Sequence, residues 1–200
     1  MKTIAAISTA AAPGGIGVIR ISGDEARAVG DRIFKSVSGA KLCDMAGYTC
    51  RFGHVYAPDG ERLDECVATV FAAPHSFTGE DVAEIHCHGG AFIVQAVLES
   101  AVRRGARQAD KGEFSRRAFV NGRMDLSQAE AVAELIAAPS REALRYSLNR
   151  LDGLLARRTE ALRAKLEELR MQVCVAVDFP EDQTCCGLPL LGTVLNRTPY

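Results

Sequence analysis

Three side chains suited to binding or catalysis alternate within one short segment of the chain. Residues 81–88 read as a β-strand, and successive side chains of a strand point to opposite faces. Glu84, His86 and His88 are therefore predicted to share one face. Two imidazoles and a carboxylate could bind a divalent metal, but no further cluster of ligands accompanies the His-x-His pair. A polar face that lines a cleft or a subunit contact is the simpler interpretation.

Glu84 also suits an organic ligand. A carboxylate facing a cleft accepts two parallel hydrogen bonds from a ligand with adjacent donors, such as the N3–H and the 2-amino group of a pterin ring. We expect Glu84 to be available for this role.

The glycine-rich segment 14–17 leads into a predicted strand that carries Arg20. The phosphate-binding patterns GxGxxG and GxxxxGK[ST] are absent throughout the sequence, so this segment is not a predicted phosphate loop. We expect a tight connection that lets the backbone approach a ligand or another subunit. A structural ion pair and a ligand contact are both open interpretations of Arg20.

A second basic group lies further along the chain. The segment 112–123 contains Arg116, Arg117 and Arg123 close to the end of a predicted helix. A solvated basic face is the simpler interpretation, and an anion-binding patch is the alternative.

The elements that must position these residues indicate an α+β fold. Strands are predicted at residues 3–9, 17–22, 48–56, 62–72 and 81–88, with helices at 24–37, capped by Asp24, and over about 14 residues after Gly90. Pro58 and Gly60 mark the turn of a hairpin. Mixed strands, helices and hairpins favour α+β over a doubly wound parallel sheet.

From about Phe114 to Val177 the pattern becomes helical. Residues 127–130 read as a capping box for a helix over 127–137, and Ser140 can cap a second helix with apolar residues at steps of three and four. If unbroken from 140 to 177, that helix would be about 57 Å long. A long amphipathic helix needs partners of similar length, so we expect an incomplete helical domain. Residues 181–200 show neither helical nor strand periodicity, and we expect a poorly ordered tail.

Composition indicates a globular protein with room for one core and a second, smaller one. The 200 residues are 48% hydrophobic, and 24 basic against 25 acidic residues give a net charge of −1. RNA would therefore need a local basic patch. Seven cysteines without a CxxC pair indicate reduced thiols and a cytoplasmic location. The apolar start resembles a short secretory signal, but it is interrupted and continues into a predicted strand.

Several motifs in the same order resemble one known family, the MnmE (TrmE) tRNA-modification GTPases. The resemblance covers about 180 residues and is carried by five segments. They are Pro13–Gly23, Pro74–Glu84, His88–Gly90, Gly112–Ala131 and Val177–Glu181.

This resemblance implies a fold and a set of ligand contacts. It implies an N-terminal domain, at residues 1–115, related to the tetrahydrofolate-binding fold of aminomethyltransferases and responsible for dimerisation. Residues 116–180 would be the first part of the helical domain. The cofactor would be 5-formyl-tetrahydrofolate or a related reduced folate near the dimer interface, with contacts at Arg20, Glu84 and Arg123. The family often has Lys at the position of Arg123. The positive charge is therefore kept, but a planar guanidinium group replaces a compact ammonium group.

The resemblance also implies partners that this sequence does not itself encode. The intact family protein acts on carbon 5 of the wobble uridine of tRNA with an FAD-containing MnmG partner. GTP, potassium and magnesium belong to a GTPase domain whose motifs are missing here. We therefore expect this chain not to hydrolyse GTP. A free-standing folate-dependent one-carbon transferase and a metal-binding protein built on Glu84, His86 and His88 are the alternatives.

Overall fold

The computed structural model describes residues 2–10, 12 and 14–178, which divide into two compact units at Leu151/Asp152. The first unit contains a seven-stranded sheet of order β3-β4-β5-β6-β2-β1-β7, in which only the β1–β7 pair is parallel. The strands are β1 (Ile4–Ile7), β2 (Gly14–Ser22), β3 (Phe34–Ser36), β4 (Thr49–Tyr56), β5 (Arg62–Phe71), β6 (Val82–Gly89) and β7 (Arg107–Gln108). This mixed sheet confirms the predicted α+β class.

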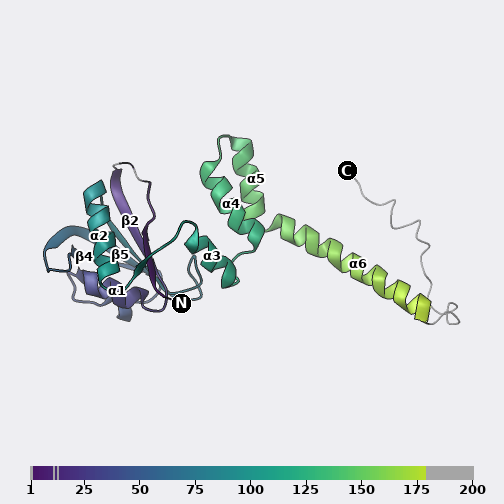
Figure 1. Cartoon of the computed structure of the whole chain (residues 1–200), viewed down its shortest axis with the longest axis horizontal. Coiled ribbons are helices and arrows are strands. Elements are labelled where there is room, and N and C mark those ends of the chain that lie inside the picture. Colours follow the sequence, from purple (N-terminus) through teal and green to yellow (C-terminus); the bar gives the residue numbers. More distant parts are fainter. Residues whose placement is uncertain (1, 11, 13, 179–200) are drawn as a thin grey trace. The chain divides into compact units, whose positions relative to one another are not determined.

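The core lies between the sheet and two helices, α1 (Ala26–Ile33) and α2 (Ala91–Arg103), which pack on one of its faces (Figure 1). Ile19, Ile21 and Ile85 point to that face and are fully buried, and each such side chain contributes roughly 1.5–3 kcal/mol. A Cβ added to Gly30 of α1 would lie 2.6 Å from a Leu42 methyl group, so any larger residue here would force the buried Leu42 side chain to shift. The helices thus leave the alternate side chains of the strands on the opposite face.

Helix α1 corrects one prediction. The periodicity predicts a helix over 24–37, but the helix ends at Ile33 and residues 34–36 form edge strand β3 against β4. The N-cap is Glu25 without a side-chain hydrogen bond, in place of Asp24. Phe34 is buried in the core from an extended backbone, which shows that packing on β4 outweighs the local helical pattern.

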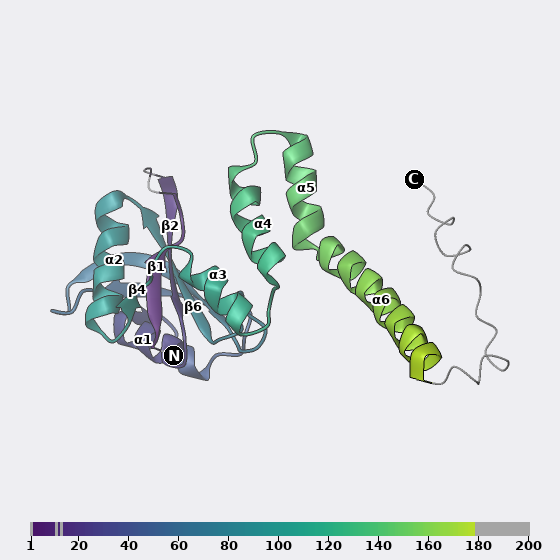
Figure 2. The same cartoon turned by 45° about the vertical axis from the view of Figure 1, so that its right-hand side comes forward.

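Three further α-helices follow in the first unit, which also contains a short 3-10 helix at Leu42–Asp44. They are α3 (Glu113–Val120), α4 (Leu126–Ala137) and α5 (Arg141–Leu151), and α4 and α5 lie side by side as a hairpin (Figure 2). The capping box of α4 is formed by Asp125 and Gln128, whose side chains and backbone N–H groups bond reciprocally at 2.8 Å. The prediction placed this box two residues too late because Ser127 and Glu130 fit the same pattern.

The predicted long helix is broken. Helix α5 ends at Leu151, Gly153 adopts a left-handed φ of 73°, and α6 spans Leu154–Asp178 in the second unit. Glycine adopts this backbone without the cost that a Cβ would add. Among the described residues, no helix is both long and apolar enough to cross a membrane. The predicted tail at 181–200 lies outside the described residues, and the predicted boundary at 115/116 stays a prediction.

Candidate functional site

Arg20 and Glu84 form an ion pair on the sheet face that α1 and α2 leave open. They are direct neighbours in the antiparallel β2–β6 register, and the Arg20 Nε donates to Glu84 Oε1 at 2.7 Å. Their side chains are 27% and 11% exposed. The terminal nitrogens of Arg20 make no hydrogen bond within the described residues, so they are available to donate hydrogen bonds to an anion or a carbonyl oxygen.

His86 completes this cluster from the next outward position of β6. Its Nε2 lies 3.3 Å from Glu84 Oε2, so the two carboxylate oxygens have different partners. The hydrogen bond from His86 lowers the pKa of Glu84; burial opposes this effect, and Arg20 reinforces it. Glu84 is therefore an anion at neutral pH and presents acceptor lone pairs to a ligand.

Two phenylalanines flank the guanidinium group of Arg20. Its Cζ lies 5.4 Å from the ring centroid of Phe77 and 5.7 Å from that of Phe114. Phe77 belongs to the loop 74–81 and Phe114 to α3, so the loop and the helix together form the walls beside the ion pair. Cation–π contacts of this kind hold the guanidinium and contribute about 0.5–2 kcal/mol each.

A buried ionic network fixes the loop against α3. Arg117 Nη1 donates to both oxygens of Glu80 at 3.0 Å, and its Nη2 donates to Glu113 at 3.1 Å and to the Lys2 carbonyl at 2.7 Å. Glu80 also accepts from Ser22 at 2.7 Å. The pKa of Glu113 is lowered because hydrogen bonds from the Asp110 backbone, Arg107 and Arg117 outweigh its burial, which acts in the opposite direction.

Arg123 reaches the same loop from the residues after α3. Its Nε donates to the Ser76 carbonyl at 3.1 Å, and Asn121 donates to the Thr78 carbonyl at 2.7 Å. Arg123 is exposed. Its partner Ser76 directly precedes Phe77, which lies beside Arg20. The structure therefore joins Arg20 and Glu84 directly and holds Arg123 against the same loop, and among the described residues no hydrogen bond or ion pair joins Arg123 to Arg20 or Glu84.

The arginines of the basic segment 112–123 do not share one environment. Arg116 is exposed, as a solvated face predicts, whereas Arg117 is almost completely buried and structural. The sequence analysis gave no separate role to Phe77, Phe114 or Arg117. Helical spacing places Phe114 and Arg117 on one side of α3, but their partners are in loop 74–81, which no local pattern identifies.

The metal-ligand arrangement is not formed. His88 does not converge with Glu84 and His86; its ring Nδ1 lies 2.8 Å from Asp64 Oδ1. No group of three or more His, Cys, Asp or Glu side chains in the described part of the chain is arranged to hold a metal ion. The Glu84–His86 hydrogen bond is instead part of the Arg20 cluster.

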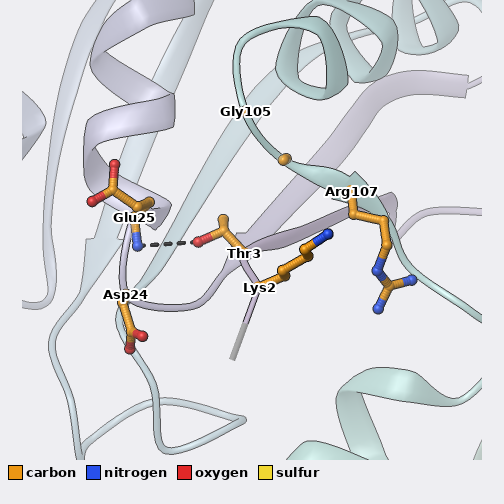
Figure 3. Close-up of a pocket in the computed structure, with 7 residues that line it drawn as sticks. Lys2, Thr3, Asp24, Glu25, Gly105 and Arg107 are labelled. Carbon is orange, nitrogen blue, oxygen red and sulfur yellow. Dashed lines mark hydrogen bonds between the residues drawn. The ribbon is translucent and has the colours of Figure 1, made fainter.

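A separate depression of about 370 Å³ lies at the Ser22 end of the β1–β2 pair (Figure 3). It is lined by Lys2, Thr3, Asp24, Glu25, Gly105, Ala106 and Arg107. Arg107 is already paired with Glu113 at 2.5 Å, and Thr3 accepts a hydrogen bond from the Glu25 N–H. Because no residue of the Arg20 cluster lines this depression, we assign the candidate site to the Arg20 cluster.

Fold and site together define an α+β domain with a candidate binding site, followed by a helical segment. Residues 3–123 match the family described as GTP-binding protein TrmE N-terminus, and residues 126–187 match the MnmE helical domain. The chain belongs to the TrmE/MnmE family and matches its N-terminal region.

Individual relatives support the same assignment. The chain is 54% identical over 188 residues to the tRNA modification GTPase MnmE of Nitratidesulfovibrio vulgaris, covering 94% of this chain and 40% of that protein. It is 50% identical over 182 residues to the protein of the same name from Lawsonia intracellularis, covering 91% of this chain and 39% of that protein. The chain thus spans about 40% of the length of the curated relatives it matches.

Proposed function

We propose that this chain is the reduced-folate-binding and dimerisation module of a tRNA-modifying enzyme that acts on carbon 5 of the wobble uridine. The observation that carries the proposal is the Arg20–Glu84 ion pair on the open sheet face, flanked by Phe77 and Phe114. The names of its relatives, tRNA modification GTPases, supply the reaction context.

The chemistry of the cluster matches 5-formyl-tetrahydrofolate. The ionised carboxylate of Glu84 can accept from the N3–H and 2-amino donors of the pterin. The terminal nitrogens of Arg20, which make no hydrogen bond to the residues the structure describes, can donate to a carbonyl or a carboxylate of the same ligand. The two phenylalanines provide apolar surface for its rings. Arg123, exposed on the adjoining segment, adds a cation for the anionic glutamyl end.

Exposed apolar side chains at one end of the sheet support self-association. Phe92 at the start of α2 is 83% exposed, and Ile16 on β2 is 66% exposed. Ile16 is the register partner of His88, and the chain from His88 leads through two glycines into α2, so both apolar side chains lie at the same end of the β2–β6 pair. A second copy of the chain would remove this surface from water.

The net charge of −1 supports a module that does not itself attract RNA. A module with no general excess of basic residues would contribute folate and the dimer contact, while tRNA and an MnmG-type FAD-containing partner engage the complete enzyme. The proposed location is the cytoplasm.

Calorimetric titration of the purified chain with 5-formyl-tetrahydrofolate tests the proposal. We expect saturable binding with one ligand per chain, and loss of binding in Arg20→Ala. The matched control is Arg103→Ala, an exposed arginine on α2 that pairs with Glu99. Absence of binding to the folded wild-type chain, or equal binding by Arg20→Ala, contradicts the proposal.

A further inference from the structure

Tyr48, immediately before strand β4, has an unusual backbone conformation. Among the described residues it is the one non-glycine residue with a positive φ, at 62°. A side chain in this left-handed region is uncommon and costs conformational energy, so it persists where the surrounding contacts require it. The Tyr48 backbone N–H donates to the Val70 carbonyl at 2.7 Å, and its ring lies edge-on to Phe71 with the centroids 5.5 Å apart. Strand β5 therefore fixes both the backbone and the ring of Tyr48.

The hydroxyl group of Tyr48 contacts loop 74–81. It donates to the His75 carbonyl at 2.6 Å, although Tyr48 is 67% exposed. Burial in the core therefore does not explain why this residue keeps a left-handed backbone. The contact holds the peptide group that joins His75 to Ser76, and the N–H of the same group donates to the Pro74 carbonyl at 3.1 Å. Both polar atoms of this peptide group thus have partners.

The next peptide group along the loop is held from the other side, by Arg123. The Ser76 carbonyl accepts from Arg123 Nε at 3.1 Å, and this peptide group leads directly into Phe77. The two peptide groups before Phe77 therefore each accept a hydrogen bond from the side chain of a distant segment. After Phe77, Asn121 donates to the Thr78 carbonyl at 2.7 Å. The backbone on both sides of Phe77 is thus held by side chains that precede β4 or follow α3.

We propose that Tyr48 is a positioning residue of the candidate ligand site and acts through the loop that carries Phe77. This role rests on the proposed function, since it concerns the site assigned there to a reduced folate. The ring centroid of Phe77 lies 5.4 Å from the guanidinium Cζ of Arg20. Without the Tyr48 hydroxyl, the His75 carbonyl loses the side-chain donor that holds it, and Phe77 is less firmly placed beside Arg20.

Tyr48→Phe removes the hydroxyl alone, and Tyr56→Phe, at the other end of β4, is the matched control. The Arg20 Nε–H resonance of the ligand-free chain reports the position of Phe77, because an aromatic ring shifts the resonances of nearby protons. We expect this resonance to move in Tyr48→Phe and to stay unchanged in Tyr56→Phe. Affinity for 5-formyl-tetrahydrofolate should fall about three- to ten-fold in Tyr48→Phe, the scale of one hydrogen bond between uncharged groups.

Tyr48→Gly separates the hydrogen bond from the backbone conformation. Glycine adopts a positive φ freely, so this variant removes the contact with the loop and also relieves the strained backbone. It should move the Arg20 resonance as Tyr48→Phe does. An unmoved Arg20 resonance in either variant, or unchanged affinity in Tyr48→Phe, overturns the inference. Failure of the wild-type chain to bind the folate, with the Arg20 resonance moved as expected, would instead overturn the proposed function and leave the link from Tyr48 to Arg20 established.

Discussion

Arg117 and Glu80 are joined by a buried ionic contact in which one guanidinium nitrogen lies 3.0 Å from both carboxylate oxygens. The two side chains are only 4% and 10% exposed. The contact links α3 to loop 74–81 and so connects Phe114 with Phe77, the two aromatic walls beside Arg20. The candidate site depends on this contact although neither residue belongs to the site.

Arg117→Met should destabilise the fold strongly. It leaves Glu80 and Glu113 buried without their shared partner, and removal of one member of a buried ion pair costs about 3–5 kcal/mol. The free energy of unfolding in urea measures this loss. Arg116→Met, at an exposed neighbouring position, should change stability by less than about 0.5 kcal/mol. Similar losses in the two variants would contradict the network described above.

Glu84→Gln should weaken binding of 5-formyl-tetrahydrofolate by about 1.5–3 kcal/mol, the scale for a hydrogen bond to a charged group. The amide presents an NH₂ group to the pterin donors, where the carboxylate presents a second acceptor. Calorimetry measures the change, and Glu99→Gln on the exposed face of α2 is the matched control. An unchanged affinity in Glu84→Gln would remove Glu84 from the site.

Stability should fall in acid partly through Glu113. Its folded-state pKa is below the ordinary value of about 4.3, so its contribution is fully present above that value and is lost as pH falls through the folded-state pKa. Unfolding free energies measured from pH 6 downward should show a shallower decline for Glu113→Gln than for the wild type. Parallel declines would show that this carboxyl group is not stabilised in its charged form.

The purified chain should neither bind nor hydrolyse GTP above background. No GxxxxGK[ST] sequence is present to cradle the phosphates and supply the lysine that contacts them. Fluorescent-nucleotide binding and phosphate release provide the measurements, with a P-loop GTPase as the positive control. Measurable turnover that copurifies with the chain would refute this prediction.

Removal of residues 139–200 should leave a folded dimer that still binds folate. The sheet, α1, α2 and the Arg117 network all lie before residue 121, and the exposed Ile16 and Phe92 are retained. Sedimentation should report a dimer, and a monomeric product would move dimerisation to the deleted part. In the full chain, amide exchange should be faster in α6, whose leucines at 155, 162 and 166 are exposed, than in β2 and β6.

The sequence was sufficient to predict the features that depend on local periodicity. Alternation placed Glu84 and His86 on one face and Ile85 on the other, and the structure agrees because α1 and α2 pack on only one face of β6. The burial of Arg117 could not be predicted in this way, since its partner Glu80 lies 37 residues earlier. Likewise β3 forms against β4, so its strand conformation depends on a pairing that the segment itself does not encode.

The local sequence pattern does not by itself identify where a helix begins or ends, because several neighbouring residues can fit the same pattern. Both Asp125 and Ser127 fit an N-cap pattern, and only the reciprocal hydrogen bonds with Gln128 identify Asp125 as the cap. Gly153 interrupts an apolar repeat that otherwise continues across α5 and α6. The repeat predicts which side chains share a stripe, whereas the positive φ at Gly153 determines where one helix ends.

The central claim, that the Arg20–Glu84 pair holds a reduced folate, is tested most directly by NMR on the intact chain during titration with 5-formyl-tetrahydrofolate. Arg20 Nε–H and the Glu84 carboxyl carbon, assigned with Arg20→Lys and Glu84→Gln, should shift together and saturate with one ligand per chain. Arg163 Nε, which donates to Glu160 Oε2 at 2.9 Å within α6, is the internal reference and should not move. Saturable shifts elsewhere in the chain, with Arg20 and Glu84 unchanged, would contradict the account.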